Sequence, residues 1–190
     1  MFGFETSSPD GYSEKLENSD YPLRMKGGNT DYASRLDNCK NFQEVFVLVK
    51  RSVKESLGLE RVGLMLYLMD LPLNVGAFHE VGSNGIVMNR ALLEQVIGST
   101  DSKSEINSFV YSILLHEYIH TLGCVDEAKT RQLTLLVSRD VFGLDHVATK
   151  MADAGPWAYM KLNPLSGNYE HGREMELVRN FEVPEHKYIS

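Results

Sequence analysis

The sequence contains little cysteine, no excess of positive charge and no long hydrophobic run. Only two of its 190 residues are cysteines, Cys39 and Cys124, so no framework of disulfide bonds is expected. The formal net charge of −7 disfavours a general binder of nucleic acids or anionic membranes. The longest apolar segment, Val62–Leu73, is interrupted by a glycine, an aspartate and a proline, so no membrane span is predicted.

The length suits one domain with its own hydrophobic core. Residues 1–35 are polar and rich in Ser, Asp, Asn and Gly, which predicts a mobile or loosely attached N-terminal arm. Residues 1–17 lack the basic and apolar regions of a secretory signal, so the expected location is cytoplasmic. We expect the folded domain at residues 36–162, followed by a polar tail at 163–190 that contains several Pro and Gly residues.

Hydrophobic periodicity within residues 36–162 predicts an α+β fold. Apolar residues at helical spacing from Phe42 to Leu57, closed by Gly58, indicate a backing helix. Short apolar segments bounded by turn residues indicate a small mixed or antiparallel sheet. The predicted elements are a buried strand at Val62–Met69, a strand pair at Ala77–Val81 and Ile86–Met88, and helices at Asn89–Ile97, Asp101–Gly123, Asp126–Gly143 and Asp145–Ala152.

The most informative segment is His116-Glu117-Tyr118-Ile119-His120, an H-E-x-x-H motif inside the helix predicted at Asp101–Gly123. Ser102 followed by Glu105 is typical of a helix start, and Gly123 of a helix end. Histidines four residues apart lie on one face of a helix, where both can bind a single Zn²⁺ ion. If the two histidines instead faced solvent, Glu117 would be an ordinary surface charge.

A catalytic zinc site usually has three protein ligands and one open position, and two acidic residues compete for the third place. Asp126 gives the spacing H-E-x-x-H-x-x-G-x-x-D, in which Gly123 allows the chain to reverse. Glu127 would open the next helix, with Asp126 as its N-cap. Coordination chemistry accepts either carboxylate. The residue that does not bind metal would cap the helix or orient a histidine.

The Asp126 spacing resembles the metzincin zinc peptidases in their minority form with Asp as third ligand. Val125-Asp126-Glu127-Ala128 resembles the gluzincins, whose third ligand is a Glu opening a second helix. The order of elements over Leu36–Gly143 resembles the small minigluzincins of that clan, and this order favours Glu127. The resemblance implies a small zincin-like fold with one zinc ion, and the hydrolysis of a peptide or protein substrate.

Within that family mechanism, Glu117 acts as general base toward a zinc-activated water. The candidates for stabilising the oxyanion are Tyr118, Arg131, His146 and Tyr159. The segment Ile86–Asn89 could be an edge strand that pairs with extended substrate, or a plain sheet edge.

Three further expectations concern the remaining residues. Cys124 is expected to be a small buried side chain rather than a ligand. The scattered histidines, taken one at a time, are not expected to bind the metal: His79, His146, His171 and His186. Because the minigluzincins are described as latent, the tail at 163–190 is either an inhibitory segment carrying Glu170, His171, Glu185 and His186, or a tail without that role.

Two non-catalytic functions compete with the peptidase. One is a zinc-stabilised domain in which the metal only holds helices together. The other is a regulatory module that holds a peptide in the cleft without cutting it. An intact Glu117 weighs against the first, because a structural metal site has no use for that carboxylate.

Overall fold

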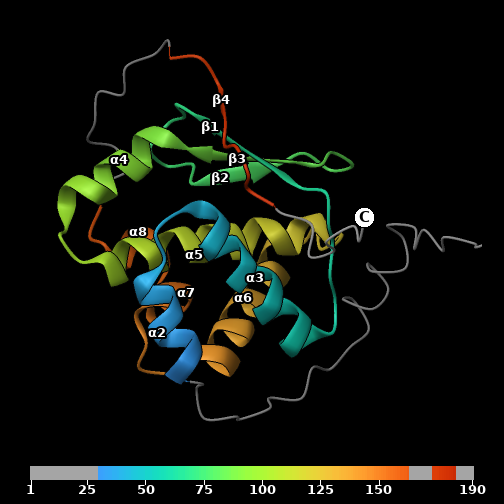
Figure 1. Ribbon diagram of the computed structural model, residues 1–190, viewed down its shortest axis with the longest axis vertical. Helices are drawn as coiled ribbons and strands as arrows, with labels where there is room; N and C mark the ends of the chain where they lie inside the picture. The colour runs from blue at the N-terminus through green and yellow to red at the C-terminus, as the bar shows by residue number, and fades with distance from the viewer. Residues whose placement is uncertain (1–29, 163–172, 183–190) are drawn as a thin grey trace, which may run out of the picture.

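A small mixed sheet lies on one side of a group of helices, which is the predicted α+β fold (Figure 1). The computed structural model describes residues 30–162 and 173–182. The strands are β1 (Met65–Met69), β2 (Ala77–His79), β3 (Gly85–Asn89) and β4 (Glu176–Leu177). The helices are α2 (Thr30–Asn38), α3 (Phe42–Leu57), α4 (Arg90–Ser99), α5 (Lys103–Thr121), α6 (Glu127–Phe142), α7 (Val147–Ala154) and α8 (Pro156–Tyr159).

The sheet has the strand order β2-β3-β1-β4. The strands β2 and β3 form the predicted antiparallel pair, and β1 runs parallel to β3. The prediction of Ile86–Asn89 as an edge strand is wrong, because β3 pairs on both sides and lies inside the sheet. Among the described residues, the edge strand that contacts α5 is β2. The sequence of β3 alone could not reveal this, because the neighbours of a strand are set by segments elsewhere in the chain.

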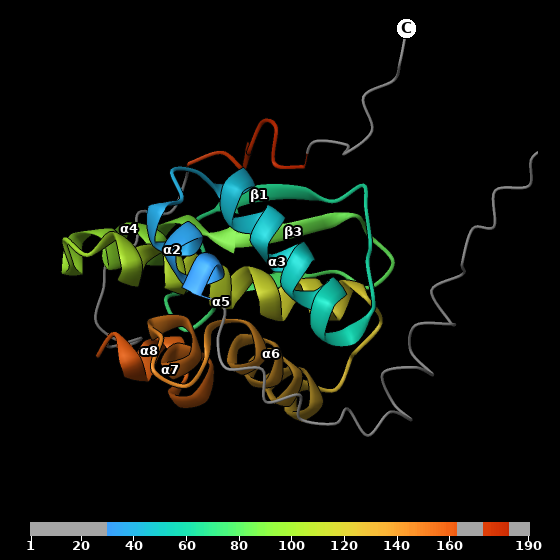
Figure 2. The same cartoon turned by 60° about the horizontal axis from the view of Figure 1, so that its bottom comes forward.

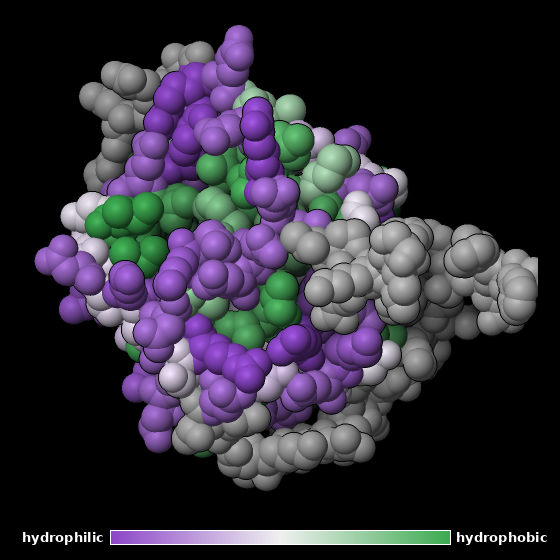
Figure 3. Space-filling model, viewed as in Figure 1, coloured by the Kyte–Doolittle hydropathy of each residue, from purple (hydrophilic) through white to green (hydrophobic). Residues whose placement is uncertain are grey.

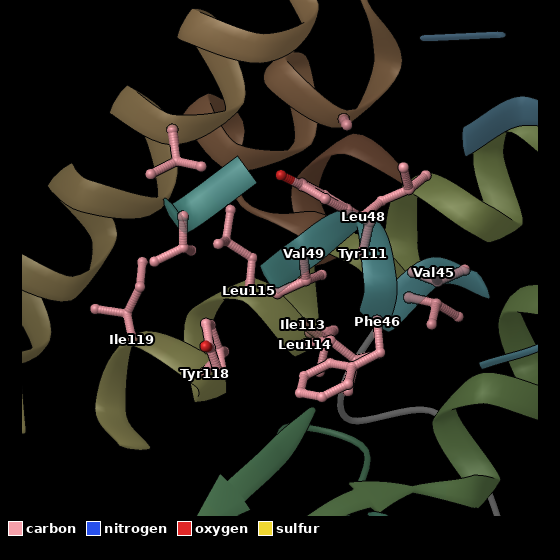
Figure 4. Packing of buried hydrophobic residues seen from close by; sticks show 14 of the residues in the cluster. Val45, Phe46, Leu48, Val49, Tyr111, Ile113, Leu114, Leu115, Tyr118 and Ile119 are labelled. Atoms are coloured by element: carbon pink, nitrogen blue, oxygen red, sulfur yellow. The ribbon is translucent and has the colours of Figure 1, made fainter. Parts of the chain in front are cut away.

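The core lies between the sheet and the helices, and α5 lies at its centre (Figure 2). Phe46 and Val49 of α3 pack near Leu114 and Tyr118 of α5 (Figure 4). The predicted backing helix is confirmed with its ends, and Gly58 closes it at φ 68°, a left-handed conformation that suits glycine. No helix of the described residues combines the length and hydrophobicity that a bilayer crossing needs. The face in Figure 3 is largely hydrophilic, with hydrophobic residues in separate patches.

The start of α5 follows the predicted capping pattern with one addition. Ser102 Oγ accepts a hydrogen bond from Glu105 N at 3.3 Å, as an N-cap should. The Glu105 carboxylate accepts from the Thr100 hydroxyl, and that hydroxyl in turn accepts from Ser102 N at 3.1 Å. The reciprocal bond of a capping box is therefore relayed through Thr100.

Three elements differ from the sequence expectation. The helix α2 already begins at Thr30, and Tyr32 is buried, so the described fold includes part of the segment predicted as an arm. The strand predicted as buried at Val62–Met69 is shorter, and its terminal residues Met65 and Met69 are exposed, so it buries one face only. The short helix α8 was not predicted, because Gly155-Pro156 reads as a stop although Pro is well placed in a first helical turn.

The described part of the C-terminal tail, residues 173–182, packs against the sheet. Here β4 pairs with β1 at the edge opposite β2. Phe181 is buried and stacks on Phe46 with ring centroids 4.2 Å apart. Glu182 forms an ion pair with Lys50 and accepts a hydrogen bond from Leu64 N. This part of the predicted tail therefore belongs to the fold.

Candidate metal centre

The two motif histidines lie one turn apart on α5, with their Nε2 atoms 3.1 Å from each other. His120 Nδ1 donates to the carbonyl of Cys124 at 2.6 Å, which leaves Nε2 with its lone pair toward His116. Cys124 is buried as expected, and its backbone, not its sulfur, orients the histidine. The local chain reversal at Gly123, with φ 96°, brings that carbonyl back beneath the helix end.

Glu127 is the acidic residue that reaches the two histidines. Its Oε2 lies 3.4 Å from His116 Nε2, and its Oε1 lies 3.2 Å from His120 Nε2. Asp126 instead caps α6, with Oδ1 accepting from Lys129 N at 2.6 Å. The geometry therefore groups His116, His120 and Glu127, whose candidate ligand atoms all lie within 4.8 Å of one another.

These three side chains fit the demands of a zinc ion. Two atoms bound to a tetrahedral zinc at about 2.1 Å from the metal lie about 3.4 Å apart. The two histidine Nε2 atoms are 3.1 Å apart, and each lies near a different oxygen of the Glu127 carboxylate, at 3.4 Å for His116 and 3.2 Å for His120. The side chain of Glu127 is 64 % exposed, so the cluster is open to solvent on one side. Two imidazoles and a carboxylate are also a donor set that suits zinc.

Glu117 lies beside the cluster and is almost completely buried, at 6 % exposure. Burial raises the pKa of its carboxyl to about 8, and the neighbouring Glu127 carboxylate adds to the effect. A carboxyl group with a pKa near neutrality can both accept and return a proton. Glu117 forms no ion pair with any described residue, so its burial costs stability. A glutamate with a purely structural role gives no reason for that cost, whereas a catalytic role does.

Burial lowers the pKa of His116, and the repulsion between protons on the two neighbouring histidines, together with the charge of Arg131, lowers it further. The effect outweighs the opposing influence of Glu127. His116 is therefore held in the neutral form, which is the form that binds metal ions.

The cluster lies where two cavities meet. The larger, of about 630 Å³, is bounded on one side by α7 and α8 and includes His116 in its lining. The smaller, of about 240 Å³, includes His79 and His120 in its lining. Three residues line both cavities: Ala77, Glu117 and Glu127. A bound chain could thus cross the cluster and extend to either side.

Of the four oxyanion candidates, Arg131 lines the larger cavity and the other three lie elsewhere. Tyr118 is fully buried, and its hydroxyl accepts from Arg61 N and donates to Arg61 O. His146 caps α7 and stacks on Phe142. Tyr159, on α8, lines neither cavity. The tail residues Glu170, His171, Glu185 and His186 lie outside the described residues.

Sequence reasoning missed His79 as part of the site. In β2 the side chains alternate, and the register places His79 opposite Ile86 and on the same sheet face as Ala77, toward α5. His79 Nδ1 lies 2.9 Å from Gly85 O, which fixes the ring beside the smaller cavity. It is not one of the three clustered residues. A strand of three residues is too short for its hydrophobic pattern to show which side chains face the helices and which face solvent.

Comparisons with protein-family models, curated proteins and solved structures found no match for this chain. The functional argument therefore depends on the residue pattern and the geometry of the cluster.

Proposed function

We propose that this protein is a zinc-dependent peptidase of the gluzincin type, with His116, His120 and Glu127 as metal ligands. One observation carries the proposal: the Nε2 atoms of two histidines lie 3.1 Å apart, each within 3.4 Å of an oxygen of the Glu127 carboxylate, and a buried carboxyl lies beside them. The donors come from two helices and converge in a cleft, which is where a substrate can reach them.

In this proposal Glu117 accepts a proton from the attacking water and later passes it to the leaving amine. A bound zinc ion would lower the pKa of that water and would polarise the scissile carbonyl. Arg131 is our candidate for stabilising the negative charge that develops on the carbonyl oxygen. It lines the larger cavity, and its positive charge is near enough to His116 to lower the pKa of that histidine. His120 is oriented for metal binding by the carbonyl of Cys124.

The edge strand β2 is the proposed seat for an extended peptide. The sequence suggested Ile86–Asn89 for this role, but that segment lies inside the sheet, so we assign the role to β2. Residues 74–77 line the larger cavity and residues 77–79 the smaller, so β2 runs from the larger cavity to the smaller. A peptide added antiparallel, the commoner pairing, runs the opposite way. The residue after the scissile bond would then enter the larger cavity.

The test measures metal content and hydrolysis in the same samples. We expect wild type to bind about one zinc per chain and to cut a mixed peptide library. Glu117→Gln should keep the zinc and lose hydrolysis, whereas His116→Ala should lose both. The variant Glu80→Gln, at an exposed position directly after β2, is the matched control and should keep both.

The two competing functions predict other results. A structural zinc domain would bind zinc and show no hydrolysis in wild type or in any variant. A peptide-binding module would retain peptides without turnover. The absence of zinc from folded wild type, even after reconstitution, would overturn both the peptidase and the zinc-stabilised domain.

A further inference from the structure

The edge strand β2 is tied to the helices near both of its ends. In the loop before β2, Trp157 Nε1 donates to the carbonyl of Leu73 at 2.8 Å, which ties this loop to α8. After β2, residues 80–84 form the turn that leads to β3. This turn is joined to the end of α5 by the side chain of Arg61, which precedes β1. The second tie is thus a side chain that the proposed mechanism does not use.

The guanidinium of Arg61 bonds to α5 and to the turn at the same time. Its Nη1 donates to the carbonyl of Thr121, the last residue of α5, at 2.5 Å. Its Nη2 donates to the carbonyl of Ser83 at 2.8 Å and to Oδ1 of Asn84 at 2.9 Å. Carbonyls in the last turn of a helix lack partners within the helix, and a positive charge is favoured there. The planar fork of an arginine suits such a bridge better than a lysine ammonium does.

The backbone of Arg61 is fixed to the same helix. The hydroxyl of Tyr118 accepts from Arg61 N and donates to Arg61 O, and Tyr118 is fully buried in α5. The side chain of Arg61 therefore extends from a rigid base. His120, a proposed metal ligand, is the residue next to Thr121. Arg61 thus connects the end of β2 to the part of α5 that carries the metal ligands.

Two further bonds of the turn stay within the turn and the sheet. Ser83 N donates to Glu80 O at 2.9 Å, and Asn84 O accepts from Met65 N at 2.8 Å. The first shapes the turn, and the second attaches it to β1. Loss of Arg61 should therefore leave the turn formed and the sheet paired, and release this end of β2 from α5.

We infer that Arg61 is a positioning residue for the substrate, because it holds the turn after β2 against the end of α5 and so fixes the edge strand relative to the metal ligands. This role rests on the proposed peptidase function, in which β2 seats the peptide. An extended peptide gains most affinity from an edge strand that is already ordered. A released strand would be competent for only part of the time, and the affinity would fall by that fraction.

The first measurement compares the kinetics of zinc-loaded Arg61 variants. Arg61→Ala should raise KM for a cleaved peptide at least about tenfold and keep kcat within about threefold, because binding that is lost equally from substrate and transition state changes KM. Its zinc content should match wild type. Arg61→Lys keeps the charge without the planar fork and should give an intermediate KM. Arg51→Ala, at an exposed arginine of α3, is the matched control and should behave as wild type.

A binding measurement separates the seating of a peptide from its cleavage. A fluorescein-labelled member of the peptide library is titrated into zinc-loaded Glu117→Gln, with and without Arg61→Ala, and its anisotropy is followed. The dissociation constant should rise at least about tenfold when Arg61→Ala is added.

Hydrogen exchange tests the tie without any substrate. In full-length metal-free protein, the amides of residues 77–84 should exchange at least about tenfold faster in Arg61→Ala, whereas those of α3 should exchange at the wild-type rate. If Arg61→Ala does not fold, Asn84→Ala replaces it in all three measurements. This variant removes one acceptor of Arg61 at an exposed position outside the left-handed backbone region, and it should raise KM about two- to threefold.

Faster exchange of residues 77–84 together with a higher KM would support the inference. Exchange at the wild-type rate, or an unchanged KM and dissociation constant, would overturn it and leave the peptidase proposal intact. Loss of zinc or a large fall in kcat in Arg61→Ala would also overturn it, since Arg61 would then act through α5 and not through β2. If wild type shows no hydrolysis, the peptidase proposal fails, and the titration and the exchange still decide whether Arg61 positions a bound peptide.

Discussion

Asp126 and Glu127 are neighbours in the chain, but their carboxylates have different partners. Asp126 accepts the hydrogen bond from Lys129 N that starts α6, and Glu127 lies 3.2 Å from His120 Nε2. As the N-cap, Asp126 turns its carboxylate toward the N–H groups in the first turn of α6, whereas Glu127, the first residue of α6, directs its carboxylate to the histidines of α5. The same short segment therefore starts one helix and completes the candidate metal site.

The two carboxylates should separate stability from metal binding. Asp126→Ala is expected to lower the unfolding free energy of the metal-free protein by about 1 kcal/mol, because the cap is lost, and to keep zinc. Glu127→Ala should leave the metal-free melting temperature close to wild type and weaken zinc binding by more than about 100-fold. Thermal melts and competition with a chelator measure the two effects. Loss of zinc in Asp126→Ala alone would assign the third ligand to Asp126.

Tyr118 should contribute to folding and not to chemistry. Its hydroxyl bonds both the N–H and the carbonyl of Arg61, at 2.7 and 3.1 Å. Tyr118→Phe should therefore lower the unfolding free energy by about 1–3 kcal/mol and leave kcat and zinc content unchanged. Urea unfolding and steady-state kinetics measure these quantities. Tyr159→Phe, on a half-buried residue, is the control. A folded Tyr118→Phe of native stability with a large loss of kcat would restore Tyr118 as an oxyanion candidate.

Much of the site could be predicted from local signals in the sequence. Contacts between segments far apart in the chain could not be predicted in this way. The ends of α5 and α6 follow from capping residues such as Ser102 and Asp126, which act within one turn. The H-E-x-x-H spacing likewise fixes which side chains share a helix face. The position of β3 inside the sheet depends on β1 and β2 together, and no residue of Ile86–Asn89 encodes it. Trp157 reaches the cavity only through tertiary packing.

Asn89 should be sensitive to the loss of a hydrogen-bond donor. It is 1 % exposed, and its Nδ2 lies within 3.0 Å of three carbonyl oxygens in the loop that leads to β2: those of Leu71, Pro72 and Val75. Asn89→Asp puts a carboxylate against these oxygens and should destabilise the protein by at least about 1 kcal/mol more than Asn89→Ala at pH 7. Urea unfolding measures both.

A nearby residue controls for the charge introduced at Asn89. Asn74 is exposed in the same loop, so Asn74→Asp should change the unfolding free energy by less than about 0.5 kcal/mol. Equal stability of Asn89→Asp and Asn89→Ala would contradict the role assigned to the amide.

Asp70 should make stability depend on pH in the acid range. Its side chain is 4 % exposed and accepts paired hydrogen bonds from Arg90 and Arg173. The bonds from Arg90 lower the carboxyl pKa to about 2 against the opposing effect of burial, and those from Arg173 add to the lowering. Since the folded pKa lies below the unfolded value near 3.8, the stabilisation is full above about pH 5 and is lost as the pH falls toward 2.

The expected size of the Asp70 effect is roughly 2 kcal/mol between pH 5 and pH 2. Asp70→Asn should be less stable than wild type at pH 6, and its unfolding free energy should fall less steeply as acid is added. Unfolding free energies at pH 6, 4 and 3 for the two proteins give the comparison. Parallel pH profiles would show that the carboxylate does not carry this effect.

The C-terminal tail should be tested for latency with a chain that keeps residues 173–182. A chain ending at Leu162 lacks Phe181, whose ring is 3 % exposed against Phe46, and removal of such a ring costs about 3–5 kcal/mol. We expect that chain to melt well below wild type, so a change in its activity would not report on inhibition. A chain ending at Glu182 keeps the packed strand, and its melting temperature should match wild type. If residues 183–190 block the cleft, this chain will show a higher kcat/KM with unchanged zinc content, and an equal kcat/KM would exclude inhibition by those residues.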